Sequence, residues 1–342
     1  MPRFVLKILA LKFKYLGDVA IMVPALRALK ERWPTAQLDV LVAKEAAPVV
    51  SELPWVHKVW SFHRSRGRAS IRSSLPLILA LRKQNFDRSV DFVGNDRGAI
   101  LSWCIGAQRR LGPKVPLGFV GRSLCYTQTI PEAPREWNEV RRDLHVLSAW
   151  DVPAPSSTDH EVHASQALAE TAAKVLPETD VILAHISASR SKKEWHLSGW
   201  IETARKAEAA NIPIVFSSGN TERERRQLAI LKKSAPAIRI LEPTESLDLF
   251  LAVIKRVRVF VSGDTGPLHF ATGLGVPTVG IFGPTLPSEW APLGPSCSTL
   301  AGGSCTCSGH AFDCSSATPC IAQVSPSDVW QQIERVYSRA GH

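Results

Sequence analysis

The chain has 342 residues, of which 45% are hydrophobic and 21% charged, and its formal net charge is +10. This length and composition fit two globular domains, each with its own core. No run of about 18 uncharged apolar residues is present, so no transmembrane helix is predicted. The first ten residues lack the apolar segment and small-residue cleavage site of a signal peptide, and we therefore expect a cytoplasmic protein.

The positive charge narrows the classes of partner. Nucleic acid, an anionic membrane surface and a phosphorylated substrate would all suit it, and a basic chain without such a partner is a common alternative. The sequence contains no zinc-finger spacing, no helix-turn-helix signal and no aromatic-rich RNA motif. Nucleic acid is therefore not expected as a partner.

Apolar strands alternate with amphipathic helices along the first half of the chain. The pattern predicts strands at residues 5–11, 37–42 and 86–92 and around Trp60, with a helix at residues 19–32. Such alternation indicates parallel strands joined by crossover helices. Residues 151–159, DVPAPSSTD, are rich in proline and serine and predict a linker.

The same alternation begins again after this linker. The predicted elements there are strands at 181–186, 212–217, 257–261 and 277–282, and helices at 198–210, 222–233 and 268–274. We therefore expect an α/β protein of two doubly wound domains, residues 1–160 and 161–342, that face each other across a cleft. Ligands of such sheets bind outside the carboxyl ends of the strands, where the motifs below also lie.

The glycine-rich turn at residues 262–267, SGDTGP, is the clearest candidate binding site. Its glycines allow close approach of a ligand, and the amides of Thr265 and Gly266 at a helix N-terminus could hold a diphosphate. His269, about one turn further on, would be an additional donor. The alternative is an ordinary turn in which Asp264 or Thr265 caps the helix and His269 faces the core.

Two further strand ends carry polar loops. Residues 187–195, SASRSKKEW, form a basic loop suited to phosphate oxygens, or alternatively a solvated surface loop. After the next predicted strand, residues 218–224 read SGNTERE, and a carboxylate there could accept both hydroxyls of a ribose. The alternative is a capping box in which Thr221 caps the helix and Glu224 occupies its third position.

The first half has one comparable loop, residues 12–18, KFKYLGD, between the first strand and the first helix. Gly17 permits a tight turn, and Asp18 comes at the start of the helix. A carboxylate there could deprotonate an attacking hydroxyl. Spacing alone favours the simpler role of a helix N-cap.

These loops together resemble glycosyltransferase family 9, the lipopolysaccharide heptosyltransferases. The N-terminal match is LGD at 16–18 followed by VPALRALK at 23–30. The C-terminal match is DTG at 264–266 with His269, GVP at 275–277 and FGPT at 282–285. Lys193-Glu194-Trp195 resembles the family's Lys-x-Trp, and Trp200 follows. The resemblance covers nearly the whole chain, with a looser match over residues 62–142.

The resemblance implies a GT-B fold and an inverting, metal-independent transfer with Asp18 as the catalytic base and Gly17 supporting its loop. The residues that it implies around the donor are Lys193, Glu224, Asp264, Thr265, Gly266, Pro267 and His269. Glu224 matches the ribose-binding carboxylate better than Glu222, although the register leaves both open.

The resemblance also implies the substrates. The donor expected is ADP-L-glycero-β-D-manno-heptose, and the acceptor is the Kdo or heptose of the lipopolysaccharide inner core. Such an acceptor is anionic and membrane-borne, so the net charge suits it and we expect the protein to lie peripherally on the inner face of the membrane. Arg64, Arg66 and Arg68, in the run HRSRGR, are candidate acceptor contacts; the equal alternative is a solvated loop.

Four of the seven cysteines, Cys305, Cys307, Cys314 and Cys320, fall where many family members also carry cysteines. Four thiolates can hold zinc or iron, and related autotransporter heptosyltransferases are similar in carrying a metal-binding cysteine cluster. The spacing C-x-C-x6-C-x5-C is looser than paired CxxC motifs. We expect free thiols or a structural zinc or iron site, and no cofactor required for catalysis.

Two other functions remain open. One is a family 9 transferase with another sugar or acceptor, as in O-antigen or autotransporter-type protein glycosylation. The other is a non-catalytic protein that binds nucleotide sugars. The retained Leu16-Gly17-Asp18 argues against the second, because a protein without chemistry does not need the carboxylate.

Overall fold

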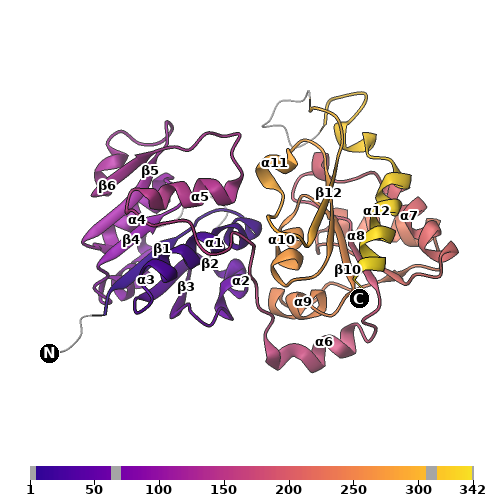
Figure 1. Cartoon of the computed structure of the whole chain (residues 1–342), viewed down its shortest axis with the longest axis horizontal. Helices are drawn as coiled ribbons and strands as arrows, with labels where there is room; N and C mark the ends of the chain where they lie inside the picture. Colours follow the sequence, from indigo (N-terminus) through magenta and orange to yellow (C-terminus); the bar gives the residue numbers. More distant parts are fainter. Residues whose placement is uncertain (1–4, 63–70, 306–313, 341–342) are drawn as a thin grey trace. The chain divides into compact units, whose positions relative to one another are not determined.

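The computed structural model describes residues 5–62, 71–305 and 314–340 (Figure 1). The chain divides into two compact units, Met1–Thr158 and Asp159–His342, and each is built around one parallel six-stranded sheet. Among the described residues, no helix is both long and apolar enough to cross a membrane.

Unit 1 has the strand order β3-β2-β1-β4-β5-β6. Its strands are β1 (Lys7–Leu11), β2 (Gln37–Ala43), β3 (Lys58–Phe62), β4 (Arg88–Asp91), β5 (Arg109–Lys114) and β6 (Gln128–Pro131). Its helices are α1 (Leu16–Arg32), α2 (Pro48–Ser51), α3 (Ile71–Arg82), α4 (Asp96–Ile105) and α5 (Glu139–Ser148). Residues 8–11 of β1 are fully buried, as expected of a central strand with helices on both faces.

Unit 2 has the strand order β12-β11-β10-β7-β8-β9. Its strands are β7 (Ile182–His185), β8 (Ile214–Ser217), β9 (Arg239–Ile240), β10 (Val259–Gly263), β11 (Thr278–Phe282) and β12 (Cys297–Ala301). Its helices are α6 (Ala169–Val175), α7 (Leu197–Ala209), α8 (Glu222–Ser234), α9 (Leu247–Ile254), α10 (Gly266–Gly273), α11 (Pro287–Trp290) and α12 (Pro326–Arg339).

The two sheets have the same topology. In each unit the first and fourth strands lie side by side at the centre, and the chain leaves this pair in opposite directions. A crevice opens at the carboxyl ends of such a pair, and this is where doubly wound sheets bind ligands. The predicted fold, two doubly wound Rossmann-like α/β domains, is confirmed.

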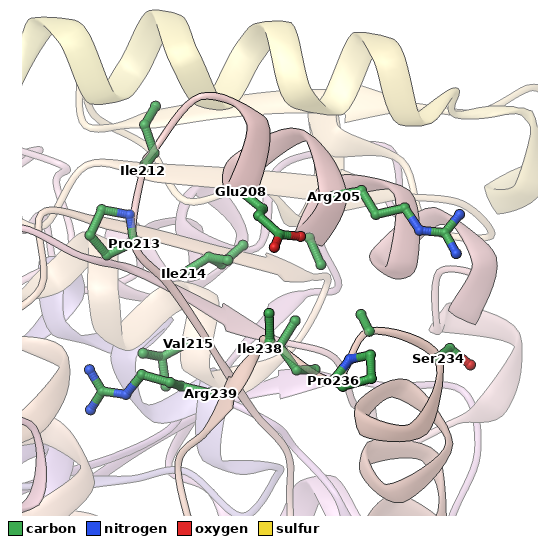
Figure 2. A pocket seen from close by; sticks show the side chains of 13 residues that line it. Arg205, Glu208, Ile212, Pro213, Ile214, Val215, Ser234, Pro236, Ile238 and Arg239 are labelled. Atoms are coloured by element: carbon green, nitrogen blue, oxygen red, sulfur yellow. The ribbon is translucent and has the colours of Figure 1, made fainter.

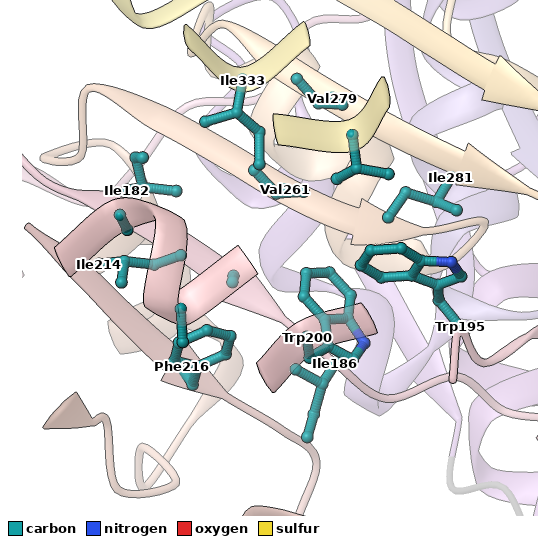
Figure 3. Close-up of a cluster of buried hydrophobic side chains, with 14 of the residues drawn as sticks. Ile182, Ile186, Trp195, Trp200, Ile214, Phe216, Val261, Val279, Ile281 and Ile333 are labelled. Atoms are coloured by element: carbon teal, nitrogen blue, oxygen red, sulfur yellow. The ribbon is translucent and has the colours of Figure 1, made fainter. Parts of the chain in front are cut away.

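The core of unit 2 includes two tryptophans in contact with each other (Figure 3). The rings of Trp195 and Trp200 meet edge to face with centroids 5.0 Å apart, and Trp200 meets Phe216 of β8 in the same way. The indole nitrogen of buried Trp195 donates to the carbonyl oxygen of Val324 at 3.0 Å. Trp195 therefore anchors the loop after β7 to the core, two residues beyond Lys193.

Candidate functional site

Three neighbouring strand ends of unit 2 bring Lys193, Asp264 and Thr285 together. Lys193 follows β7, Asp264 follows β10 and Thr285 follows β11. The Lys193 Nζ lies 2.6 Å from Asp264 Oδ2, and the Thr285 hydroxyl donates to the same oxygen at 2.7 Å. The side chains of Asp264 and Lys193 are only 5% and 17% exposed. A lysine held in this way is positioned to meet an anionic ligand.

Close backbone packing sets this geometry. A Cβ atom on Gly263, the last residue of β10, would lie 3.0 Å from the carbonyl oxygen of Lys193. A larger residue would push the loop after β7 away from β10. Gly263 therefore allows the lysine and the aspartate to approach across the two central strands.

Helix α10 begins directly after this pair. Thr265 is its N-cap and Gly266 and Pro267 are its first residues. The predicted side-chain cap is wrong: Thr265 makes no capping bond, and Asp264 contacts Lys193 and Thr285 instead. The Thr265 hydroxyl is buried without a hydrogen-bond partner among the described residues. An unsatisfied buried hydroxyl beside first-turn amides and a lysine suits a phosphate group.

His269 lies inside unit 2, where it is 3% exposed. Its Nδ1 is 3.3 Å from Nε2 of His160, and the two rings stack with centroids 5.2 Å apart. The sequence had not indicated His160. A ligand role for His269 stays a prediction.

Glu224 lies at the carboxyl end of β8, in the first turn of α8. The capping box proposed as the alternative is present: the amide and hydroxyl of Thr221 both donate to Glu224 Oε2, at 2.9 and 2.5 Å. Glu224 is buried, whereas Glu222 is exposed. A Cβ atom on the nearby Gly219 would lie 2.5 Å from Glu224 Oε1, so this glycine makes room for the carboxylate.

A buried hydrogen-bond chain supports Glu224 from behind. The Nδ1 of His185, at the end of β7, is 3.1 Å from the Ser217 hydroxyl, and its Nε2 is 3.2 Å from the Ser187 hydroxyl. Ser187 accepts from the amide of Gly219 at 2.8 Å, and its hydroxyl helps to lower the pKa of Glu224. Buried polar groups from the ends of β7 and β8 therefore support the carboxylate.

Burial and hydrogen bonding set the electrostatics of His185 and Glu224. Burial lowers the pKa of His185 to about 4, so its ring is neutral at pH 7. Burial alone would raise the pKa of Glu224, but hydrogen bonds from Thr221 and Ser187 outweigh it and hold that pKa below its usual value. The carboxylate is therefore ionised and able to accept hydrogen bonds from a vicinal diol.

A second ion pair fixes the loop that carries Lys193. Arg223 of α8 binds Glu194 through both guanidinium NH2 groups, with two contacts of 2.8 Å, and also donates to the carbonyl oxygen of Ala188. Glu194 in turn accepts from the amide of Ala188 at 3.1 Å. This bidentate contact ties the ends of β7 and β8 together.

The candidate site of unit 1 centres on Asp18, which is 4% exposed. Tyr15 is the N-cap of α1, so the N-cap role considered for Asp18 is wrong, and Asp18 occupies the third helical position. Its Oδ2 accepts from the Tyr15 amide at 2.8 Å. Its Oδ1 is buried without a hydrogen-bond partner in the described structure, with Lys14 Nζ 3.7 Å away. One oxygen is thus held by the backbone while the other can accept a proton.

Helix α5 places charged side chains beside this loop, and the sequence did not indicate these contacts. Buried Lys12 forms an ion pair with Asp143, and Lys14 pairs with Glu139 at 3.3 Å. A cavity of about 200 Å³ lies here, and its charged lining residues are Lys14, Glu132, Glu139, Arg142 and Asp143. The spacing of Glu139, Arg142 and Asp143 along one face of a helix was the available signal, but nothing in the sequence paired that helix with the loop.

The pKa directions in unit 1 follow from these contacts. Burial would lower the pKa of Lys14, but Asp18, Glu139 and Asp143 raise it above its usual value. Burial raises the pKa of Asp143 to about 6, with Lys12 acting against that shift. Lys14 therefore stays protonated near Asp18 at neutral pH.

The predicted arginine cluster and cysteine cluster both include residues outside the described part of the chain. Arg64, Arg66, Arg68 and Cys307 are not among the described residues. Of the other cysteines, buried Cys320 forms a side-chain hydrogen bond with Cys305; burial, Cys305 and Cys314 together raise its pKa. Within residues 5–62, 71–305 and 314–340, no group of three or more His, Cys, Asp or Glu side chains could hold a metal ion.

A separate cavity of about 530 Å³ lies in unit 2 between α7, α8 and β8 (Figure 2). Its lining includes Ile212, Ile214, Ile238 and Arg239. These residues belong to the amino-terminal ends of β8 and β9, and none of the predicted donor residues lines the cavity. It is not part of the candidate site.

Comparison with known proteins shows what the chain resembles. Residues 75–312 match the model of glycosyltransferase family 9 (heptosyltransferase). The lipopolysaccharide core heptosyltransferase OpsX of Haemophilus influenzae is 25% identical over 295 residues, which cover 82% of this chain and 80% of that protein.

Solved structures share the fold over nearly the whole chain. The ADP-heptose lipopolysaccharide heptosyltransferase II of E. coli has a TM-score of 0.80 at 19% identity, covering 98% of this chain and 100% of that one. The iron-containing dodecameric glycosyltransferase TibC of enterotoxigenic E. coli has a TM-score of 0.57 at 13% identity, covering 98% and 78%.

Proposed function

Because the chain belongs to glycosyltransferase family 9, the heptosyltransferases, we propose that it transfers heptose from ADP-L-glycero-β-D-manno-heptose to the Kdo or heptose of a lipopolysaccharide inner-core acceptor. The reaction inverts the anomeric centre and needs no metal ion. Unit 2 binds the nucleotide sugar, and unit 1 binds the acceptor and supplies the base. The enzyme works in the cytoplasm, peripherally at the inner face of the membrane, and has no nucleic-acid partner.

One observation supports the donor site above the others. Lys193 and the start of α10 come from the central strand pair of unit 2, where β7 and β10 lie side by side. The buried hydroxyl of Thr265 has no partner among the described residues, and a phosphate oxygen would satisfy it. Lys193 would exchange part of its contact with Asp264 for the diphosphate, while Asp264 keeps its bond from Thr285.

Glu224 is the carboxylate that suits the ribose. It is buried and ionised, whereas Glu222 is exposed to solvent. The chain through Ser187 and His185 holds it in one orientation, so less conformational entropy is lost when a diol binds. We therefore propose that Glu224 makes the ribose contact and that Gly266 and Pro267, the first residues of α10, lie at the diphosphate.

Asp18 is proposed as the general base. The Oδ1 of Asp18 would take the proton of the acceptor hydroxyl. As it does so, the hydroxyl oxygen of the acceptor attacks the anomeric carbon of the sugar and the ADP oxygen leaves. The Lys14 ammonium lies 3.7 Å from Oδ1 of Asp18. The turn expected at Gly17 is wrong, because Gly17 is the second residue of α1, directly before Asp18.

The proposal is tested by donor competition on a core-truncated lipopolysaccharide acceptor. ADP-heptose is expected to be used and UDP- or GDP-linked hexoses poorly, because a wrong base or sugar leaves a buried polar group unsatisfied at a cost of about 5- to 150-fold. Preferred transfer from a UDP-hexose would overturn the heptosyl assignment while leaving the roles of Asp18 and Lys193 standing.

A second acceptor class has two observations in its favour. The fold similarity to TibC and the pairing of Cys320 with Cys305 fit an autotransporter-type protein heptosyltransferase. Transfer to a protein acceptor, with none to lipopolysaccharide, would favour it. In either case we propose that the cysteines, with or without a structural zinc or iron ion, take no part in the chemistry.

A further inference from the structure

Exposed apolar side chains gather on one part of unit 1. Of the thirteen large hydrophobic residues found exposed in the described chain, eight lie between Leu75 and Leu124. Scattered exposed residues need no explanation, but a concentration of this kind indicates a surface that meets a partner.

Two helices form the first part of this surface. Leu75 and Leu79 of α3 and Trp103 of α4 line one groove, and their exposed fractions are 48%, 50% and 62%. Along α4, Ile100 lies one turn before Trp103 and one turn after Asp96, so the three share a face.

The loop from β5 to β6 continues the surface at the start of α4. The amide of Phe119 donates to Asp96 at 3.3 Å, and Arg122 pairs with the same carboxylate at 2.9 Å. Leu117 and Leu124 in this loop are 83% and 81% exposed. We call the exposed residues of α3, α4 and this loop the α3–α4 surface.

The charge of this region is one-sided. Residues 74–130 contain eight Lys or Arg, three Asp and no Glu, so they carry +5 of the chain's net +10 in a sixth of its length. Asp91 is buried and Asp96 is paired with Arg122, whereas Lys83, Arg109 and Lys114 are exposed. The charge that solvent meets around the α3–α4 surface is therefore mainly positive.

We infer that the α3–α4 surface docks on an anionic lipid bilayer, with its leucines and Trp103 in the headgroup region and its lysines and arginines on the lipid phosphates. Aliphatic and tryptophan side chains ringed by cations suit that boundary. A second copy of the chain fits less well, because a symmetric contact would place two cationic faces together.

The position of this surface connects it with the proposed base. The side-chain amide of Asn95, the N-cap of α4, donates to the carbonyl oxygen of Phe13 at 3.4 Å, within the loop that carries Asp18. Docking through α4 would therefore bring the Asp18 loop near the lipid-water boundary. This inference rests on the proposed function in one respect: the lipid-linked acceptor would reach the Asp18 loop at that boundary.

The test is flotation of the full-length protein with vesicles of phosphatidylcholine alone or mixed with phosphatidylglycerol. Leu79→Ser with Trp103→Ser removes apolar contacts, and Lys83→Glu with Arg109→Glu reverses charge. Their matched controls lie in unit 2: Ile230→Ser with Leu286→Ser, at 45% and 52% exposure, and Arg226→Glu with Lys233→Glu on α8. Thermal unfolding of each variant confirms that it folds.

We expect wild type and both controls to bind only the anionic vesicles, and to be released as salt rises from about 0.1 M to about 1 M. Each unit 1 variant should bind at least about tenfold more weakly, since one basic residue near the surface is worth about fivefold. Transfer to a deacylated, soluble acceptor should be unchanged, which separates this result from failure of the proposed function.

Four outcomes would overturn the inference. Wild-type protein that does not bind the anionic vesicles excludes the lipid partner. Equal loss in the charge control, Arg226→Glu with Lys233→Glu, makes the binding a property of net charge alone. Equal loss in the apolar control, Ile230→Ser with Leu286→Ser, means that the leucines and tryptophan of unit 1 have no special role. A wild-type oligomer that dissociates when Leu79 and Trp103 are replaced assigns the surface to a second copy of the chain, as light scattering would show.

Discussion

The loop after β1 in unit 1 and the loops after β7 and β10 in unit 2 occupy equivalent places in the same strand order, yet they leave different groups unsatisfied. In unit 1 the orphan is an acceptor, the Oδ1 of Asp18. In unit 2 it is a donor, the hydroxyl of Thr265 beside Lys193. One topology thus supports two kinds of site, one suited to taking a proton and the other to holding an anion.

The lysines of the two sites also differ in how fully acidic side chains pair with them. Lys12 and Lys14 of unit 1 are both matched by acids of α5, so little positive charge remains for a ligand. Lys193 of unit 2 has one acidic partner among the described residues, Asp264, which Thr285 can still satisfy if the lysine turns to a phosphate. The chemistry of a loop at the carboxyl end of a central strand therefore depends on which neighbouring helix packs against it, and variants can test this directly.

The largest effect should come from Asp18→Asn. The amide keeps an oxygen for the Tyr15 amide but cannot take a proton, so kcat is expected to fall by about 10²- to 10⁴-fold. ADP affinity by calorimetry and the unfolding temperature should stay at wild-type values. Wild-type turnover in this variant would remove Asp18 as the base, and a matching loss of stability would reduce it to a structural residue.

Lys193→Met tests the proposed anion-binding site of unit 2. A hydrogen bond to a charged group is worth about 1.5–3 kcal/mol, so ADP affinity should fall by about 10- to 150-fold. The control is Lys206→Met on α7, whose lysine pairs with Glu202 on the helix surface. Calorimetry with ADP is the measurement, and unchanged affinity in both variants would move the diphosphate to another place.

His185 gives a smaller, pH-dependent effect. Its pKa is about 4 in the folded protein and about 6.5 in an unfolded chain, so between these values the unfolded state binds more protons. Its contribution to stability is present above pH 6.5 and is lost as pH falls toward 4. One pH unit in this window corresponds to about 1.4 kcal/mol.

The check is urea unfolding of wild type and His185→Gln at pH 6.5 and 5.5. The variant cannot take up the proton, so its stability should fall by about 1 kcal/mol less than that of wild type over this interval. Parallel losses in the two proteins would mean that His185 is not held neutral.

The sequence predicted the strands of both central pairs and the glycine-rich turn after β10, because buried parallel strands are near-continuous apolar runs that end at polar loops. It wrongly predicted a turn at Gly17, which lies in α1. It did not predict β5 or β6: β5 reads RRLGPK, with charges at both ends and a proline, and its burial pattern comes from tertiary packing. Nor did it predict β12, an edge strand with no buried residue.

For the candidate site, the sequence indicated the types of residue involved but not which residues contact one another. Asp264 and Lys193 are 71 positions apart in the chain, and Lys12 and Asp143 are 131 apart. Only the strand order brings such residues together. The helix caps show the same limit. Local rules offered the Thr221–Glu224 capping box, which is present, and a cap by Asp264, which is absent because a distant lysine binds that carboxylate.

The smallest effect is expected from replacing Cys305, Cys307, Cys314 and Cys320 together with serine. Cys305 follows β12 and Cys320 precedes α12. Strand β12 is at the edge of the sheet, separated by β11 from the central pair that carries Lys193 and Asp264. Because the described cysteines contact one another and neither candidate site, kcat and ADP affinity should remain close to wild type.

Stability should respond instead. Loss of the Cys320–Cys305 contact in a partly buried place is expected to cost about 0.5–3 kcal/mol, as for other single-site core changes. Metal analysis of the wild-type protein distinguishes free thiols from a structural zinc or iron site, since bound metal would make the loss larger and sensitive to chelators. A folded serine variant that has lost transfer activity would give the cysteines a role in the chemistry. It would contradict the expectation that a cluster beside the edge strand β12 does not affect a site at the central strands β7 and β10.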